Sequence, residues 1–250
     1  MDLKLKYYLQ IANNALILSH RLSEYCSRAP FLEEDLANTN VALDLIGIAE
    51  ATLEQAAILQ GKGLSGDDLA YRRPENEFYN TLLVEQPNKD FAYIVVRQFL
   101  TDAYHVAFFS ELTKSKDPFL SALAYKSIKE VTYHLRRSSE WMVRLGDGTE
   151  EAHVKVQTAL DSLWKFAKEF FKETDADIFM QNMGLGADLS KVETAWNQKI
   201  REIYIMATLK YPPLNDSQVY GGKEGKHSEH LGHILAEMQF LTNKYPDAKW

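Results

Sequence analysis

The chain has 250 residues, 46 % of them hydrophobic, and a formal net charge of −7. This acidic balance argues against a nucleic-acid-binding protein, because such proteins present a basic face to the phosphates. Asn13 and Asn14 interrupt the apolar stretch near the N-terminus, and no apolar run approaches the ~18 residues that a membrane span needs. The single cysteine, Cys26, rules out an intrachain disulfide, so we expect an inert thiol in a cytoplasmic protein.

Apolar residues recur at spacings of three and four along most of the chain, which is the period of an amphipathic α-helix. Four long helices are predicted, at about 2–28, 32–60, 91–114 and 118–145. In the first helix the predicted inward residues are Leu5, Tyr8, Leu9, Ala12, Ala15, Leu16 and Leu22. In the second helix they are Leu36, Leu43, Ile46, Leu53 and Ala57.

The connection between the second and third helices is long and irregular. We predict that residues 62–88 form a crossover, with a short helix near 78–84, and ferritin-like bundles have one such crossover between two helix pairs. Further helices are predicted at about 150–172, 189–209 and 228–243. The predicted fold is therefore all-α: a ferritin-like four-helix bundle with extra C-terminal helices, forming one domain over residues 1–250.

The aromatic side chains favour a structural role. Trp141, Trp164 and Trp196 have apolar neighbours at helical spacing, so we expect them in the core or at helix contacts rather than against a cofactor.

A ferritin-like bundle can hold two metal ions when two helices each supply a Glu and the other two each supply Glu-x-x-His. The second and fourth helices have only parts of that pattern. Asp44 is followed by Gly47 where the histidine would stand, and Glu130 is followed by Tyr133. His134 lies one residue beyond, about 100° further round the helix.

The other two helices do not complete the pattern. The third has Asp102 and His105 at the i, i+3 spacing, and the first has only His20 and Glu24. One interpretation is a working di-metal oxygenation centre, and the other is a set of polar groups that pair inside the bundle, since buried charges must be paired. We favour the second, and predict no catalytic, cofactor-binding or metal-binding residue in this chain. The degenerate site positions are Glu24, Asp44, Gly47, Asp102, His105, Glu130, Tyr133 and His134.

A second histidine cluster lies before and within the last predicted helix. His227, His230 and His233 are spaced by three residues and could bind a metal ion on one helix face. The alternative is a capped helix start, with Ser228 or the preceding loop accepting hydrogen bonds from the first amides. We favour the cap, because the spacing is not that of Glu-x-x-His.

Several segments resemble one known family. They are residues 18–26 (LSHRLSEYC), 42–47 (ALDLIG), 80–88 (NTLLVEQPN), 102–105 (DAYH), 129–135 (KEVTYHL) and the tail 221–250. In order and spacing they are similar, over essentially the whole chain, to the non-catalytic bundle subunit of the bacterial phenylacetyl-CoA epoxidase.

The resemblance implies a role in aerobic phenylacetate degradation. In that family a related catalytic subunit holds the di-iron site and epoxidises the ring of phenylacetyl-CoA, and a reductase with flavin and iron–sulfur centres supplies electrons from NADPH. The subunit that this chain resembles pairs with the catalytic subunit and supports it without cofactors of its own. The broken motifs Asp44-x-x-Gly47 and Glu130-x-x-Tyr133 agree with that role.

Two alternatives to a supporting subunit stay open. One is an autonomous di-metal oxygenase, and the other is a metal-free all-α binding protein. A homodimer of the isolated chain is a further possibility. The oxygenase would need an unusual ligand set made of Glu24, Asp44, Asp102, His105, Glu130 and His134.

Overall fold

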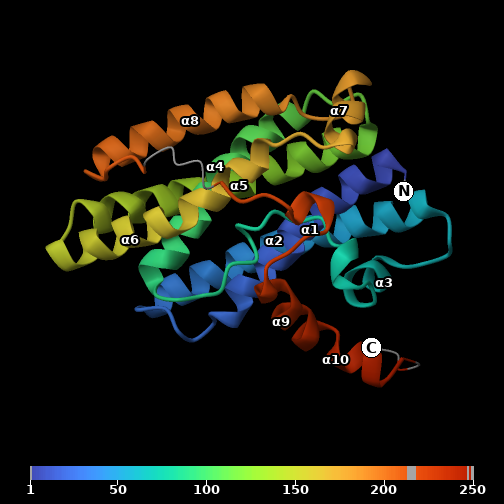
Figure 1. Cartoon of the computed structure of the whole chain (residues 1–250), viewed down its shortest axis with the longest axis horizontal. Coiled ribbons are helices and arrows are strands. Elements are labelled where there is room, and N and C mark those ends of the chain that lie inside the picture. The colour runs from blue at the N-terminus through green and yellow to red at the C-terminus, as the bar shows by residue number, and fades with distance from the viewer. Residues whose placement is uncertain (1, 213–217, 247, 249–250) are drawn as a thin grey trace. The chain divides into compact units, whose positions relative to one another are not determined.

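The computed structural model describes residues 2–212, 218–246 and 248. Within these ranges the chain forms α-helices, short 3₁₀-helices, turns and loops, and no strand (Figure 1). The predicted all-α class is confirmed. The four long helices are α1 (Leu3–Glu24), α2 (Leu32–Gln60), α4 (Phe91–Leu112) and α5 (Pro118–Gly146). None of the helices in the described ranges is both long enough and apolar enough to cross a membrane.

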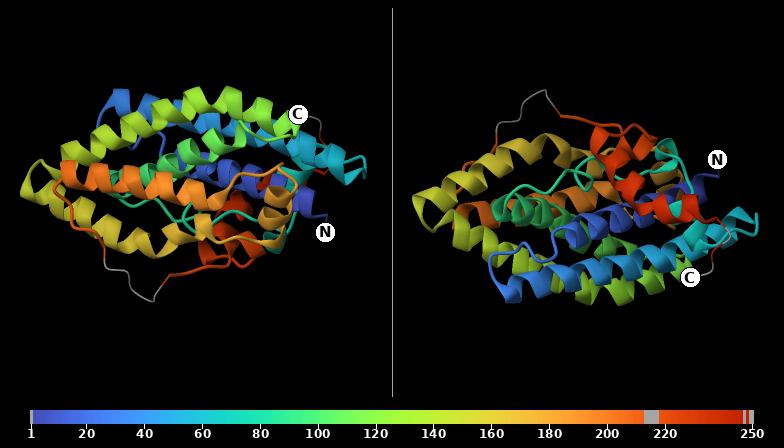
Figure 2. Two further views of the ribbon diagram at one scale, coloured as in Figure 1. Left: turned by 90° about the horizontal axis from the view of Figure 1, so that it is seen from above. Right: turned by 90° about the horizontal axis from the view of Figure 1, so that it is seen from below.

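The chain divides into two compact units, Met1–Pro87 with Tyr220–Trp250, and Asn88–Val219. Each unit contains one pair of long helices in contact along their lengths, α1 with α2 in the first and α4 with α5 in the second (Figure 2). Two such pairs joined by a long connection are the parts from which ferritin-like bundles are built. The expectation of a single domain over residues 1–250 stays a prediction.

The buried face of α1 is the predicted one. All seven of its predicted inward residues are buried. In α2 the prediction is right for Leu53 and Ala57 and wrong for Leu36 and Leu43, which are 55 % and 62 % exposed. The buried face of α2 runs through Leu45 instead. Because leucine or isoleucine stands on both sides of this helix, the apolar period alone could not identify the buried side.

The predicted helix at 78–84 is absent. Residues 62–88 contain α3 (Gly66–Tyr71) and η1 (Glu75–Glu77), and residues 78–84 are irregular but buried. The backbone N–H of Tyr79 donates to Asn13 Oδ1 at 3.1 Å, and that of Thr81 donates to Asn14 Oδ1 at 3.0 Å. Side-chain oxygens of Asn13 and Asn14 on α1 therefore satisfy backbone N–H groups of this buried segment.

In the second unit, α4 contacts α5, α6 (Glu150–Ala167) and α8 (Leu189–Met206), and most of its side chains are buried. The predicted helix at 150–172 ends as η2 (Lys168–Phe171), and the sequence interpretation missed α7 (Asp175–Asn182). Trp164 and Trp196 are buried as predicted. Trp141 is half-buried and meets Phe91 edge-on, with ring centroids 4.9 Å apart.

The C-terminal part of the first unit starts with η3 (Gly222–Glu224). The single helix predicted at 228–243 is two helices, α9 (Glu229–Met238) and α10 (Phe240–Lys244). Leu231, Ile234 and Leu235 form the buried face of α9.

Candidate functional site

Asp102 of α4 is the centre of a buried polar cluster in the second unit. Its carboxylate is fully buried and accepts two hydrogen bonds, from Gln98 Nε2 at 2.6 Å and from Ser138 Oγ at 2.8 Å. Gln98 lies one helical turn before Asp102, and Ser138 lies on α5. Asp102 therefore pairs inside the bundle and links α4 to α5, and its hydrogen-bond partner on α5 is Ser138.

Burial controls the protonation of this cluster. It raises the pKa of Asp102 to about 6, although nearby His134 and the two hydrogen-bond donors oppose the rise. Burial also lowers the pKa of His105 to about 3, and the charge of His134 adds to that effect. His105 is thus neutral at pH 7, and the Asp102 carboxylate is satisfied by its hydrogen bonds from Gln98 and Ser138.

Of the remaining degenerate positions, His134 is buried, and the other five are less buried. Glu130 and Asp44 are half-buried, and Glu24 is exposed and accepts a hydrogen bond from Arg21 Nη1 at 2.8 Å. Tyr133 is 55 % exposed, and a Cβ added at Gly47 would meet no atom within 4 Å. A side chain at either of the last two positions points to the exposed side of its helix. Their placement therefore gives no support to the interpretation of both as replaced metal-binding histidines.

The donor groups do not fit a metal ion. Within residues 2–212, 218–246 and 248, no three His, Cys, Asp or Glu side chains are arranged to hold one. Glu24 and Asp44 belong to the first unit, whereas Asp102, His105, Glu130 and His134 belong to the second. The absence of metal chemistry in this chain stays a prediction.

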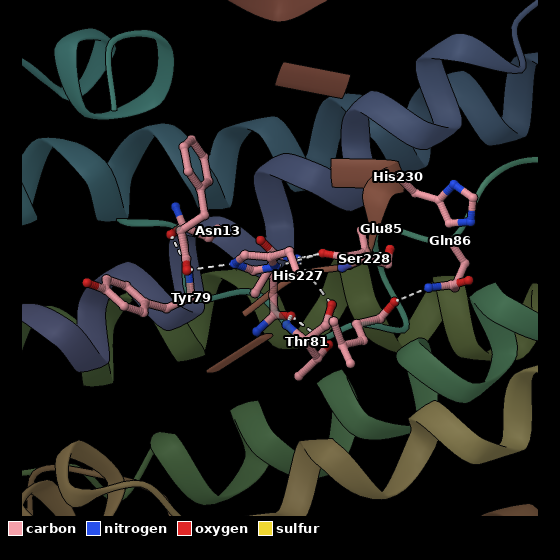
Figure 3. A network of polar contacts seen from close by, with 12 residues as sticks. Asn13, Tyr79, Thr81, Glu85, Gln86, His227, Ser228 and His230 are labelled. Carbon is pink, nitrogen blue, oxygen red and sulfur yellow. Dashed lines mark hydrogen bonds and ion pairs between the residues drawn. The ribbon is translucent and has the colours of Figure 1, made fainter. Parts of the chain in front are cut away.

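The histidine cluster near the C-terminus has a different role from either predicted one. His227 precedes α9, with Nδ1 2.8 Å from Glu85 Oε2 and Nε2 2.9 Å from the Phe78 carbonyl (Figure 3). Ser228 occupies the N-cap position of α9, but its hydroxyl caps no helix amide and donates to Glu85 Oε1 at 2.7 Å. His233 is exposed. The predicted Ser228 cap is therefore wrong, and the histidines do not converge on one point.

The geometry makes His227 an imidazolium. Both of its nitrogens face acceptors, and only the protonated ring has two N–H donors. Burial lowers the pKa of His227, but the hydrogen bond and charge of Glu85, with the Phe78 carbonyl and the charge of Glu75, more than offset it, so the pKa is raised. The side chains of His227 and Glu85 are fully buried and form an ion pair.

Glu85 collects several donors besides His227. Its Oε1 also accepts from the Ser228 backbone N–H at 2.7 Å, and its Oε2 accepts from Asn80 Nδ2 at 3.0 Å. Arg21 of α1 donates to the backbone carbonyl of Glu85 at 2.9 and 3.0 Å, and to that of His230 at 3.1 Å. This cluster, which we call the Glu85 cluster, fastens the C-terminal segment and the irregular segment at 78–87 to α1.

Sequence reasoning missed Gln98, Ser138 and Glu85. Gln98 could have been found, because it lies four residues before Asp102 on the same helix face. The sequence contains no signal that pairs Glu85 with His227, since 142 residues separate them.

The fold defines a ferritin-like helical protein, and among the described residues no three His, Cys, Asp or Glu side chains are arranged to hold a metal ion. The chain belongs to the phenylacetic acid catabolic protein family, whose pattern matches residues 2–250. The C subunit of the 1,2-phenylacetyl-CoA epoxidase of Escherichia coli (strain K12) is 45 % identical over 246 residues, which are 98 % of each chain. The resemblance seen in the sequence segments is confirmed.

Proposed function

We propose that this chain is the supporting subunit of a multicomponent di-iron monooxygenase that epoxidises the aromatic ring of phenylacetyl-CoA. The observation that carries the proposal is the match over nearly the full length to a relative whose name is that of an epoxidase subunit. The resemblance assigns the di-iron centre to a catalytic partner subunit, and flavin, iron–sulfur and NADPH chemistry to a reductase.

The residues of this chain support the role by fixing its structure. The Asp102–Ser138 hydrogen bond links α4 to α5, and the Glu85 cluster holds the C-terminal segment. Both sets of groups form contacts within the chain. This arrangement is more typical of a rigid scaffold than of a catalytic centre, because the groups already have partners. We place the complex in the cytoplasm, in agreement with the single, exposed cysteine Cys26.

Co-expression with the catalytic subunit of the same organism tests the proposal. We expect one stable complex on size-exclusion chromatography at micromolar concentration, with an interface above about 2,000 Å², as obligate assemblies have. With the reductase added, phenylacetyl-CoA turnover should require the catalytic subunit. If this chain with the reductase alone converts phenylacetyl-CoA and holds iron, it is an autonomous oxygenase and the proposal is wrong.

A further inference from the structure

One side of α2 is exposed along the whole helix and carries large apolar residues. Its residues follow one another at spacings of three and four, so they share one helix face. We call this face the α2 row: Leu32, Leu36, Asn40, Leu43, Gly47, Glu50, Glu54 and Ile58. Leu32, Leu36, Leu43 and Ile58 are 70 %, 55 %, 62 % and 70 % exposed. The opposite side of α2 is already buried. A helix that is apolar on two sides usually has a partner on each, and clustered exposed apolar residues mark interaction sites.

Gly47 lies in the middle of this row. A glycine inside a helix is destabilising relative to alanine, and is kept where another backbone approaches closely. Because a Cβ at position 47 would meet nothing within 4 Å, packing inside the chain does not require the glycine. The close approach that Gly47 permits is therefore available to a second molecule.

The charge of α2 indicates what kind of surface can cover the row. The helix carries six carboxylates and no lysine or arginine; the carboxylates are Glu33, Glu34, Asp35, Asp44, Glu50 and Glu54. The first three lie in the first turn, where the helix dipole favours them. Glu50 and Glu54 lie in the row itself. Glu54 accepts a hydrogen bond from the Gly66 backbone N–H at 3.3 Å, and neither carboxylate forms an ion pair with a lysine or arginine of the described chain. A complementary surface combines apolar side chains with basic ones.

We propose that the α2 row is the docking surface for the catalytic subunit, which presents a helix with apolar side chains against Leu36 and Leu43. The same helix carries Lys or Arg opposite Glu50 and Glu54. This inference rests on the proposed function. A second copy of this chain fits less well, because its own α2 would bring six more carboxylates and no cation.

The size of the row agrees with a partial interface. A helix of 29 residues is about 43 Å long and about 10 Å wide, so one face covers about 430 Å². The interface expected with the catalytic subunit, above about 2,000 Å² in total, buries at least about 1,000 Å² on each partner. The row therefore supplies less than half of such an interface, and neighbouring surface supplies the rest.

The first test removes the apolar contacts. The double variant Leu36→Asn/Leu43→Asn is compared with a matched control, Val154→Asn/Ile205→Asn, whose side chains are 51 % and 72 % exposed on α6 and α8. Isothermal titration with the purified catalytic subunit measures Kd. We expect Kd to rise at least about tenfold in the α2 variant and to stay within about twofold in the control, since central apolar anchors dominate interface energies. Thermal unfolding of each free variant should match the wild type, because the changed side chains are exposed.

The second test uses Gly47 and the charges. Gly47→Leu fills the open space, so it should weaken binding at least about tenfold while the free chain melts no lower than the wild type. Gly47→Ala should bind better than Gly47→Leu. Glu50→Lys/Glu54→Lys should slow association about tenfold at low salt and make its rate less dependent on ionic strength.

The outcomes separate this inference from the proposed function. If the wild-type chain binds the catalytic subunit and the Leu36/Leu43 and Gly47→Leu variants bind equally well, the docking surface is wrong and the proposed function stands. If the wild-type chain does not bind at all, the proposed function fails and the docking surface with it. The remaining alternative is that the α2 row binds a second copy of this chain, which sedimentation of the free chain tests. If the variants convert a homodimer into a monomer without changing Kd for the catalytic subunit, the inference is wrong.

Discussion

At the scale of single residues, the buried carboxyl group of Asp102 makes the stability of the chain depend on pH, because burial disfavours its charged form. Its pKa of about 6 lies above the ordinary 3.8. The native state therefore holds this proton more tightly than the unfolded state does, so the free energy of unfolding falls as pH rises from about 4 to 6. Asp102→Asn should remove that fall. The free energy of unfolding of the variant, relative to that of the wild type, should rise by up to about 3 kcal/mol between pH 4 and pH 8. Urea unfolding measures it.

The exposed Glu237 provides the control for Asp102. Glu237→Gln should follow the wild-type pH profile, and a parallel profile for Asp102→Asn would contradict the assignment. Asp102→Ala, which leaves Gln98 and Ser138 without their acceptor, should lower the melting temperature by several degrees. Added ferrous iron should not restore it, and epoxidase activity should fall only as far as complex assembly falls.

His227 has the opposite pH dependence. Its pKa is raised by the ion pair with Glu85, so its contribution to stability is fully present below pH 6.5 and is lost as pH rises through the raised value. His227→Gln should cost about 2 kcal/mol at pH 6, the usual value of a buried charged hydrogen bond. The difference from the wild type should shrink at pH 9. Urea unfolding at both pH values measures it.

The exposed imidazole of His233 is the matched control for His227. His233→Gln should leave the free energy of unfolding unchanged within about 0.5 kcal/mol, as surface substitutions usually do. If the cost of His227→Gln is the same at pH 6 and pH 9, the ring is neutral in the native state, and the ion pair assigned to it does not exist.

At the scale of elements, Trp196 joins α8 to α4. The ring is fully buried, its centroid lies 5.5 Å from that of Trp164, and Nε1 donates to the Leu100 carbonyl at 2.9 Å. Trp196→Ala should cost about 3–5 kcal/mol through the cavity it leaves, and Trp196→Phe less, since most of the apolar ring is kept. Thermal or urea unfolding measures both.

Trp141 serves as the comparison, because it is half-buried and lies against Phe91 at the edge of the same unit. Trp141→Ala should cost less than half as much as Trp196→Ala, since less apolar surface leaves contact with protein. A cost of Trp196→Ala within about 0.5 kcal/mol, as for a surface substitution, would show that α8 is not a core element of the second unit.

At the scale of the whole molecule, we expect the purified chain to contain iron or manganese at well below one atom per molecule. The described residues offer no group of three ligands arranged to hold a metal ion. Elemental analysis after expression in iron-rich medium measures the content, with the catalytic subunit prepared in parallel as the positive control. Two metal atoms per chain and a bridged-iron absorption band would contradict the supporting role.

The sequence by itself determined the helices and much of the family assignment. Helix period and helix breakers act over a few residues, so the spacing in α1 was enough to predict its buried face, and the bounds of α2, α4 and α5 follow from local signals. The incomplete Glu-x-x-His pattern was equally local, since both members stand on one helix turn.

The tertiary structure alone decided three features. Residues 78–84 are irregular, and the backbone N–H groups of Tyr79 and Thr81 donate to Asn13 and Asn14 of α1, partners that no local pattern reveals. The buried side of α2 is set by what packs against it, because both sides carry large apolar residues. Glu85 and His227 meet across 142 residues of chain. Each of these features depends on contacts between distant segments, and the free energy of such contacts is fixed only once the chain has folded.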